Sequence, residues 1–550
     1  MTDASGDESA VDAVVVGAGF AGLYMAHRLR DHLGLSVRGI EAAEGVGGTW
    51  YWNRYPGARC DIESQLYCYS FSRELEQEWD WSERFPAQPE VLRYLNHVAE
   101  RFDLNRSFTF GTRVVGADLD ETSDTWLVPT DRGERLRARF LIAATGNLSA
   151  ERIPDFPGRD DFRGHTYFTG DWPHQPVDFS GRQVALIGTG STGVQLVPHV
   201  ARQAAALTVF QRTPAYACPL GNRPIDAGTM ARIKADYPAI RQREWDFPGG
   251  VIFDDVRPSA LAETPEARQR FYEQKWQAGG MNLWLGSYED ILLDERANET
   301  VAEFVRDKIR SRVDDPDTAE KLTPRGYPFG AKRQTLEDGY YEAFNQPHVE
   351  LVDVKATPIE CITPDDIRTA DRHHPVDDII FATGFDAFTG ALYRMNIRGR
   401  GGRLLSDHWT AGPRPYLGLN TSGFPNLFFI TGPLSPSVLF NMPRAIEQHC
   451  DWIADCITWL RAHDYRAIEA LPDAEAGWVD HVREVADATL LPQADSWYLG
   501  ANVPGKPRVF MVYLGGCANY KKRCDEEAAA GYEGFTLIPS SGAGNRSIGP

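Results

Sequence analysis

Two absences narrow what this chain does. No apolar run approaches the roughly 18 residues of a membrane-spanning helix, so no membrane span is expected. Positive charge is also scarce, because 57 Lys and Arg against 77 Asp and Glu give a formal net charge of −20. That balance excludes nucleic acid and an anionic membrane as main partners, and any basic site must be local.

Cysteine is sparse and carries no pattern. The eight cysteines are scattered, with neither a CxxC motif nor the Cys/His spacing of a zinc site. We therefore expect no metal site, no disulfide framework and no dithiol reductase chemistry, and we predict reduced thiols in a cytoplasmic protein. The opening MTDASGDESA is acidic and polar, unlike a secretory signal.

What the chain does contain is a glycine turn between a strand and a helix. An apolar stretch at 11–16 runs into a GxGxxG pattern at 17–22, and a helical pattern comes next. A second strand, 35–40, ends in Glu41. This order predicts a dinucleotide site, in which the helix N-terminus faces the pyrophosphate and the acid accepts hydrogen bonds from ribose hydroxyls.

The same pattern recurs in the middle of the chain. A strand at 184–187 runs into a second GxGxxG at 188–193, and the next strand, 207–210, is followed by Arg212 instead of an acid. An arginine at this place pairs with a 2′-phosphate and favours NADPH over NADH. A solvated surface arginine would leave the same signature, so both interpretations stay open.

Two further patterns indicate the domain organisation. Ala-Thr-Gly follows an apolar strand at 144–146 and again at 382–384, which is typical of the exit from a nucleotide domain in proteins that bind two dinucleotides. Residues 221–325 change to periodic charged segments, such as 264–278 and 298–312, and predict a helical insertion.

Three loops are candidates for ligand contact. Residues 47–61 are so rich in glycine, aromatics and proline that we expect neither helix nor strand, and the loop lies either against a flat ring or on the surface. Lys332 and Arg333 follow a rigid aromatic turn and are either ligands or surface charges. The glycine-rich stretch 497–506 predicts a lid that carries an exposed Trp497.

The last third predicts a buried strand at 424–431 and a helix through 446–460. His449, on that helix, is expected to be packed or at the surface and not catalytic. After Leu537 the chain becomes rich in Ser and Gly, which predicts a disordered tail.

Together these motifs resemble the class B flavoprotein monooxygenases, specifically the type I Baeyer–Villiger monooxygenases. The resemblance covers about residues 11–537, and it includes both GxGxxG sites and the stretches at 47–64, 327–333, 381–387 and 501–510. It implies an FAD-containing, NADPH-dependent enzyme that uses O₂ to convert a small-molecule ketone to an ester or lactone through a flavin C4a-peroxide.

The resemblance also implies an α/β fold with two dinucleotide-binding, Rossmann-like domains and a helical insertion in the NADP domain. The expected boundaries are 1–146 and 384–538 for the FAD domain, 147–220 and 328–383 for the NADP domain, 221–327 for the insertion, and 539–550 for a disordered tail. We expect a monomer or a weak dimer.

The family's site residues carry over to matching positions here. Arg333 is the implied catalytic residue, with Asp61 as its carboxylate neighbour, because a guanidinium that does not titrate suits an oxyanion. The implied cofactor-binding residues are Gly17, Gly19, Phe20, Gly22, Glu41, Gly48, Thr49, Trp50, Tyr55, Asp61, Gly188, Thr189, Gly190, Ser191, Thr192, Gly193, Gln195, Arg212, Thr213, Lys332 and Met442. The implied substrate pocket consists of Leu434, Val438, Leu439, Phe440 and Trp497.

One position departs from the family's F-x-G-x-x-x-H-x-x-x-W fingerprint. Phe162, Gly164 and Trp172 match, but Phe168 stands where the histidine belongs. His165 is three residues earlier, and in an extended segment that odd offset places it on the opposite face. The outcomes left open are a slower or less coupled enzyme, a rewired enzyme of ordinary activity, and loss of activity.

Other functions remain alternatives at this point. The same cofactors serve an N- or S-oxidising flavin monooxygenase, and a weakly coupled protein would act as an NADPH oxidase that yields only hydrogen peroxide. Gln334 and Thr335 stand beside Arg333 where aliphatic residues occur in a relative, which predicts a somewhat more polar ketone.

Overall fold

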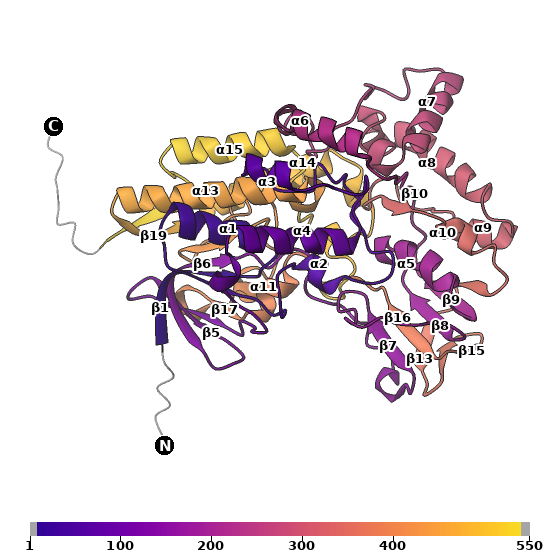
Figure 1. Ribbon diagram of the computed structural model, residues 1–550, viewed down its shortest axis with the longest axis horizontal. Helices are drawn as coiled ribbons and strands as arrows, with labels where there is room; N and C mark the ends of the chain where they lie inside the picture. Colours follow the sequence, from indigo (N-terminus) through magenta and orange to yellow (C-terminus); the bar gives the residue numbers. More distant parts are fainter. Residues whose placement is uncertain (1–7, 541–550) are drawn as a thin grey trace.

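The computed structural model describes residues 8–540, and Figure 1 shows the helical layers around its two main sheets. The larger sheet has eight strands in the order β17-β4-β5-β6-β1-β2-β3, with β18 paired to β6 beyond the end of β5. Its strands are β1 Glu8–Val16, β2 Val37–Ile40, β3 Phe108–Thr109, β4 Ala117–Asp120, β5 Thr125–Pro129, β6 Arg135–Ala143, β17 Ile397–Arg398 and β18 Leu427–Phe429. Its centre, β6-β1-β2-β3, is parallel, which requires helical crossovers and buries both faces.

The second sheet is parallel throughout. Its order is β12-β9-β8-β16-β7, and its strands are β7 His165–Phe168, β8 Gln183–Ile187, β9 Ala206–Gln211, β12 Val349–Asp353 and β16 Asp378–Phe381. Three small sheets complete the strands: β10 Ala217–Pro219 with β11 Thr335–Glu337; β13 Ile359–Ile362, β14 Asp366–Thr369 and β15 His373–Pro375; and β19 Tyr465–Ala470 with β20 Phe535–Pro539.

The helices fall into three groups along the chain. Those before the second sheet are α1 Phe20–His27, α2 Thr49–Trp52, α3 Arg73–Glu78 and α4 Gln88–Arg101. Those of the middle are α5 Ser191–Ala201, α6 Ala227–Glu244, α7 Pro265–Ala278, α8 Glu295–Arg310, α9 Pro316–Leu322 and α10 Tyr340–Ala343. Those of the last part are α11 Gly390–Arg394, α12 Leu405–His408, α13 Met442–Ala462, α14 Pro472–Asp487 and α15 Cys517–Ala529.

The same close glycine contact occurs in both main sheets, between the glycine turn after one strand and the end of the neighbouring strand. A Cβ atom at Gly17 would lie 2.5 Å from the Ala144 carbonyl oxygen, and one at Gly188 would lie 2.4 Å from that of Ala382. Both glycines have φ near +110°, where a side chain is strained. Both alanines begin an Ala-Thr-Gly, which directly follows β6 in the larger sheet and β16 in the second sheet. The end of that neighbouring strand therefore packs against the glycine turn in each sheet.

The predicted helical insertion corresponds to α6–α9; in Figure 1 α6 lies next to α3, α7 and α8 lie at the upper right, and α9 packs near β12 of the second sheet. Local caps define its helices. The Asp226 side chain accepts from Thr229 N at 2.7 Å to begin α6, and Asp294 accepts from Arg296 N at 2.7 Å to begin α8. The insertion begins after β10 and ends before β11, and these two parallel strands pair directly with one another.

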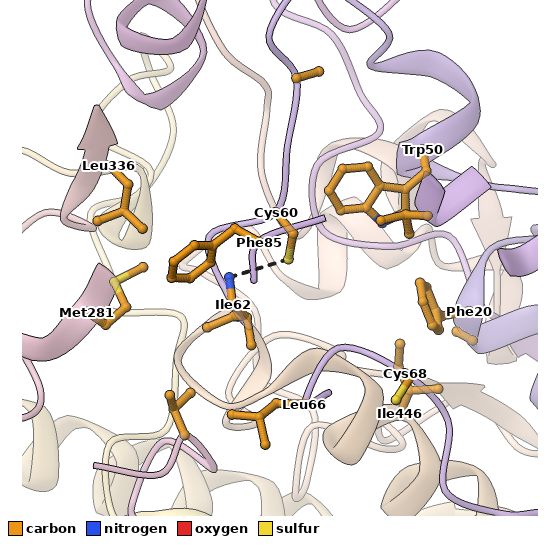
Figure 2. Close-up of a cluster of buried hydrophobic side chains, with 14 of the residues drawn as sticks. Phe20, Trp50, Cys60, Ile62, Leu66, Cys68, Phe85, Met281, Leu336 and Ile446 are labelled. Carbon is orange, nitrogen blue, oxygen red and sulfur yellow. Dashed lines mark hydrogen bonds between the residues drawn. The ribbon is translucent and has the colours of Figure 1, made fainter. Parts of the chain in front are cut away.

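One hydrophobic core runs through all these parts. Figure 2 shows Phe20 of α1, Trp50 of α2 and Ile446 of α13 in the same cluster as Met281 of the insertion and Leu336 of β11. Each of the five is buried, with no more than 8% of its surface exposed. The insertion is therefore packed into the body of the protein and is not an appendage.

Several local expectations were wrong. Residues 47–61 do contain a helix, because α2 turns inside the aromatic stretch and is held by packing against α4. The strand predicted at 424–431 is paired only over β18, since Asn426 and Thr431 take positive φ and bend the chain out of the ladder. Pro539 is the last residue of β20, and the rest of the predicted tail, 541–550, lies outside the described residues.

All eight cysteines are free thiols, and all except Cys361 are buried. Across residues 8–540, no helix is long and apolar enough to cross a membrane. The same residues contain no group of His, Cys, Asp and Glu side chains arranged to hold a metal ion.

The glycine turns lead to a test with an internal control. A Cβ at Gly193 would lie 2.1 Å from the Gly188 carbonyl oxygen, whereas one at Gly190 would meet nothing within 4 Å. We expect Gly193→Ala to lower stability by about 1–3 kcal/mol, as overpacking does, and Gly190→Ala to lower it much less. Thermal unfolding of both variants measures this, and equal shifts would show that close packing at this turn is not limiting.

A buried histidine leads to a second test. His449 is fully buried; its Nδ1 accepts from Thr431 N and its Nε2 hydrogen-bonds the Tyr520 hydroxyl, both at 2.9 Å. Burial lowers the pKa of His449 from 6.5 to about 3, so the folded chain resists a proton that the unfolded chain accepts. Stability from this group is therefore lost as pH falls below about 6.5, by about 2 kcal/mol between pH 7 and pH 5.

His449→Asn removes this titration. Its unfolding midpoint should be lower at pH 7, because the contacts to Thr431 and Tyr520 are weakened, but it should fall less than that of the unmodified protein between pH 7 and pH 5. Parallel pH dependence in the two proteins would contradict a neutral His449.

Candidate functional site

Arg333 is the centre of the site, and it contacts two distant segments. Its Nε and Nη2 donate to Asp61 Oδ2 and Oδ1 at 2.6 Å and 2.8 Å, and its Nη1 donates to the Val438 carbonyl at 2.7 Å. Asp61 follows α2, Arg333 stands two residues before β11, and Val438 precedes α13. The bidentate pair fixes the plane of the guanidinium, which a single contact would not do.

The surroundings keep this guanidinium charged. Its side chain is 20% exposed and that of Asp61 is 25% exposed, so both are mostly removed from water. Burial alone would lower the pKa of Arg333, but the Asp61 carboxylate outweighs it and raises that pKa above its ordinary value. The site therefore holds a fixed positive charge that can face a developing oxyanion at any ordinary pH.

The first glycine turn is built to hold a dinucleotide. Gly19 and Gly48 face one another so closely that a Cβ at Gly48 would lie 2.9 Å from the Gly19 Cα. Gly22, in the first turn of α1, packs against the Gly17 carbonyl, and Phe20 and Thr49 begin the two helices beside this contact. Two backbone turns therefore meet without side chains between them, which fits a pyrophosphate at a helix N-terminus.

Glu41 stands at the end of β2, as its spacing predicts. Its carboxylate is buried and accepts from Ala18 N at 2.6 Å and from Ala43 N at 2.7 Å. Burial raises the pKa of Glu41, although these hydrogen bonds oppose the shift. The acid is thereby held beside the glycine turn, where ribose hydroxyls of a bound adenosine would lie.

The aromatic loop after α2 joins the two nucleotide sites. The Tyr55 hydroxyl donates to Gln195 Oε1 at 2.8 Å and lies 3.5 Å from Thr192 Oγ1, and both partners are on α5. Trp50 is buried, and its Nε1 donates to the Tyr67 hydroxyl at 3.2 Å. The loop is therefore fixed between the domains and is not a surface loop.

The second glycine turn has the same construction, but there is more free space beside its middle glycine. Gly190 has free space where a Cβ would point, directly before Ser191, the first residue of α5. The Thr189 hydroxyl donates to the Thr213 carbonyl at 3.1 Å and so joins the ends of β8 and β9. An open glycine at a helix N-terminus fits a phosphate.

Cations gather beside this turn. Arg212, the residue after β9, is exposed, and Lys332 is half-buried with its Nζ 4.7 Å from the centre of the Tyr327 ring. Burial and the nearby positive charges of Arg212 and Lys355 lower the pKa of Lys332 to about 8. The lowered pKa of Lys332 reflects a cluster of positive charge at this place, and a bound dianion would oppose that shift.

The predicted pocket residues do not all meet. Val438, Leu439 and Trp497 pack into one apolar cluster with Phe388, whereas Leu434 lies in the main core and Phe440 packs with Trp245. Met442 is partly buried at the start of α13, against the main core. Trp497 is not exposed as expected, because its ring stacks on that of Phe388 with centroids 5.6 Å apart.

The fingerprint segment forms β7, with the two residues of interest on opposite sides. The Phe168 side chain is 6% exposed and meets Phe385 edge to face, with ring centroids 5.8 Å apart. His165 is exposed, and its Nδ1 lies 3.0 Å from Asp378 Oδ1. His165 therefore does not substitute for the missing histidine, as the odd offset predicts.

Two polar residues at the site escaped the sequence argument. Tyr498 is fully buried beside Arg333; burial raises the pKa of Tyr498, and the charge and hydrogen bonding of Arg333 oppose that shift. Asn441, also fully buried, directly precedes α13. The Asn-Met-Pro order at 441–443 is a helix-start signal that marks Asn441, but Tyr498 is hidden in an aromatic run.

Comparison with known proteins assigns the chain. The family described as pyridine nucleotide-disulphide oxidoreductase matches residues 14–219. A Baeyer-Villiger monooxygenase of Pseudooceanicola batsensis is 45% identical, with 96% of each chain covered, and phenazine N-monooxygenase PhzNO1 of Lysobacter antibioticus is 41% identical, covering 96% of this chain and 98% of the relative. Among solved structures, an oxidized steroid monooxygenase bound to NADP is 50% identical with a TM-score of 0.91, and closed cyclohexanone monooxygenase is 44% identical with a TM-score of 0.95, each match covering 97% of this chain and 100% of the other.

These relatives share the chain from end to end, at identities far above those that chance produces. The two glycine turns, the loop between them and the Arg333 pair all lie within the shared region. The chain therefore belongs to the Baeyer–Villiger monooxygenases, which are class B flavoprotein monooxygenases.

Proposed function

We propose that Arg333, oriented by Asp61, is the group that makes this enzyme's oxygen transfer possible. The enzyme uses FAD, NADPH and O₂ to convert a ketone to an ester or lactone, with NADP⁺ and water as the other products. FAD, when bound and reduced, supplies the activated oxygen. The observation that carries the proposal is the bidentate contact of a mostly buried guanidinium with a carboxylate.

The chemistry assigned to these residues follows from their charges. As oxygen adds to the ketone carbon, negative charge grows on the carbonyl oxygen, and a fixed cation that needs no reorganisation stabilises it. Asp61 and the Val438 carbonyl accept from three of the five N–H groups of Arg333, and the buried Tyr498 side chain lies beside the same guanidinium. Asp61 also keeps the cation from turning toward water.

Arg212 and Lys332 are the proposed readers of the 2′-phosphate of NADPH. Both flank the open glycine turn, and the lowered pKa of Lys332 shows that the two charges affect one another. The turn 188–193 is assigned to the pyrophosphate. Thr213 holds this turn by accepting from the Thr189 hydroxyl, and Gln195 holds the neighbouring loop through Tyr55.

The domain boundaries follow the two sheets. The strands of the larger sheet lie at 8–143 and 397–429, which supports an FAD domain at 1–146 and 384–538. Those of the second sheet lie at 165–381, which supports an NADP domain at 147–220 and 328–383. The helices between β10 and β11 support an insertion at 221–327.

The residues next to Arg333 do not select a polar ketone. Gln334 Nε2 donates to the Gly280 carbonyl at 3.0 Å, and the Thr335 hydroxyl lies 3.4 Å from the Tyr216 carbonyl. Both residues are buried, and these two groups contact the protein itself, whereas Gln334 Oε1 has no partner among the described residues. The proposed substrate is a ketone of unspecified polarity.

N-oxidation is the second candidate function. It is favoured by the 41% identity to a phenazine N-monooxygenase and by Phe168 in place of the fingerprint histidine. Mass spectrometry of products from a ketone, a sulfide and an aromatic N-heterocycle, with NADPH consumption and peroxide measured alongside, separates it from ester formation.

The proposed location is the cytoplasm, as a monomer or weak dimer. Eight thiols without a disulfide suit a reducing compartment. Among the described residues, only Val115 and Leu293 are large hydrophobic side chains that stand exposed, so no extended apolar patch is present to support a tight dimer.

Replacing Arg333 tests the proposed role. Arg333→Ala should retain yellow FAD but lose ester formation by at least about 100-fold in kcat, because a lost oxyanion donor costs that much. Arg333→Lys keeps the charge but not the bidentate contact, so its kcat for ester formation should lie between those of the unmodified enzyme and Arg333→Ala. Ester formation that survives in Arg333→Ala would refute the assignment.

The cation pair leads to a pH-dependent test. As pH rises through about 8, Lys332 loses its proton, so kcat/KM for NADPH should fall while that for NADH changes little. Arg212→Ala should lower kcat/KM for NADPH far more than for NADH, and it should move the break to higher pH because one source of the depressed pKa is gone. Equal effects on both nucleotides would argue against 2′-phosphate recognition here.

A further inference from the structure

The loop that holds Arg333 in place is itself strained. Residues 434–441 carry the Val438 carbonyl, which accepts from Arg333, and two of their residues, Leu434 and Ser437, have positive φ of 64° and 45°. Backbone of this kind persists only where surrounding contacts enforce it. The loop therefore needs anchors, and its C-terminal anchor is Asn441.

Asn441 is held by the helical insertion. Its side-chain Nδ2 donates to Glu244 Oε1 at 2.8 Å and to the Leu66 carbonyl at 2.8 Å. Its backbone N–H donates to the Gly249 carbonyl at 2.9 Å. Glu244 is the last residue of α6, so the C-terminal end of one insertion helix is hydrogen-bonded to the C-terminal end of the 434–441 loop.

Glu244 is an unusual residue to find at this place. Its side chain is completely buried, yet it is an acid. Its Oε2 lies 3.1 Å from Arg241 Nη1 and 3.7 Å from Arg444 Nε, while its Oε1 is left for Asn441. The two carboxylate oxygens therefore differ in role, because one faces two cations and the other receives the loop.

The rest of the buried network is balanced without the loop. Arg241 also contacts Glu76 at 2.7 Å, and Arg444 contacts Glu447. Glu447 Oε1 accepts from the backbone N–H groups of Ser70 and Phe71. The network could thus be neutralised inside the protein with no contact to residues 434–441, so the Glu244 contact with Asn441 is an additional feature.

The chain after Glu244 extends the same support. The Trp245 and Phe440 rings pack with centroids 5.6 Å apart, and a Cβ at Gly250 would lie 2.2 Å from the Phe440 ring. Side chain, backbone and ring contacts from one short stretch of the insertion therefore converge on Phe440 and Asn441.

We propose that Glu244 is a positioning residue for oxygen transfer, through a path from Glu244 to Asn441, along the 434–441 loop to the Val438 carbonyl, and so to Arg333. It touches neither substrate nor cofactor. It fixes the loop that fixes the catalytic guanidinium, and it makes the helical insertion part of the reaction centre. The inference rests on the proposed role of Arg333.

Glu244→Gln is the sharpest test, because glutamine has one acceptor oxygen where glutamate has two. The amide can serve the arginines or Asn441, but not both. We expect faster amide hydrogen exchange at 437–445, a kcat/KM for ketone that is lower by about tenfold to 100-fold, more peroxide per NADPH, and an unchanged KM for NADPH.

Glu76→Gln is the matched control. In the part of the chain that the structure describes, the Glu76 carboxylate hydrogen-bonds Arg241 and no residue of the 434–441 loop. The variant removes one charge from the same buried network, so it should lower the unfolding midpoint without altering exchange at 437–445 or the peroxide yield. Asn441→Ala, which removes the donor instead of the acceptor, should reproduce the effects of Glu244→Gln.

The outcomes separate the possible failures. Unchanged exchange and coupling in Glu244→Gln, or the same changes in Glu76→Gln, would overturn the positioning role. If Glu244→Gln does not fold, Asn441→Ala decides by the same two measurements. Hydrogen exchange needs no turnover, so it tests the loop contact separately from the proposed function. If the unmodified enzyme makes no ester but Glu244→Gln exchanges faster at 437–445, the loop contact stands and the proposed function is refuted.

Discussion

The structure depends on the contact of one guanidinium with two distant segments. Arg333 reaches Asp61 in the first third of the chain and the Val438 carbonyl in the last third. A charge this far from water is tolerated only with its partner in place, and removing either member of such a pair leaves the other uncompensated. One guanidinium thus ties together three segments that lie far apart in the chain.

The two glycine turns are built from the same backbone contacts. In each, the first glycine of the turn passes over the carbonyl of an alanine that begins Ala-Thr-Gly, and the third glycine packs on the carbonyl of the first. The two domains differ in the residue after the second strand, which is the buried Glu41 in one and the exposed Arg212 in the other. This residue is the difference that we propose distinguishes the two dinucleotide sites.

The parts of this arrangement that the sequence predicts are those that depend on local rules. The glycine turns, the acid after β2 and the helices α7 and α8 follow from spacing and residue type. For His449 the sequence left a packed and a surface position open, and the structure buries it. The parts that it misses depend on distant neighbours. Helix α2 forms because α4 packs on it, Trp497 is covered by Phe388, and nothing in the sequence around Glu244 indicates that Asn441 will meet it. The roles of the site residues came from resemblance, since spacing alone left Arg333 and Lys332 as either ligands or surface charges.

The entry and exit of the helical insertion have an evolutionary consequence. Strands β10 and β11 pair in parallel, Ala217 with Thr335, so the chain leaves and returns across a single short ladder. Helices α7–α9 can lengthen or shorten without altering the register of either main sheet, whereas α6 must keep Glu244 in place to hold Asn441. Arg333 stands two residues before that ladder and keeps its place through such changes. The outer helices of the insertion can thus diverge while Glu244, Asn441 and Arg333 keep the contacts that join them through the 434–441 loop.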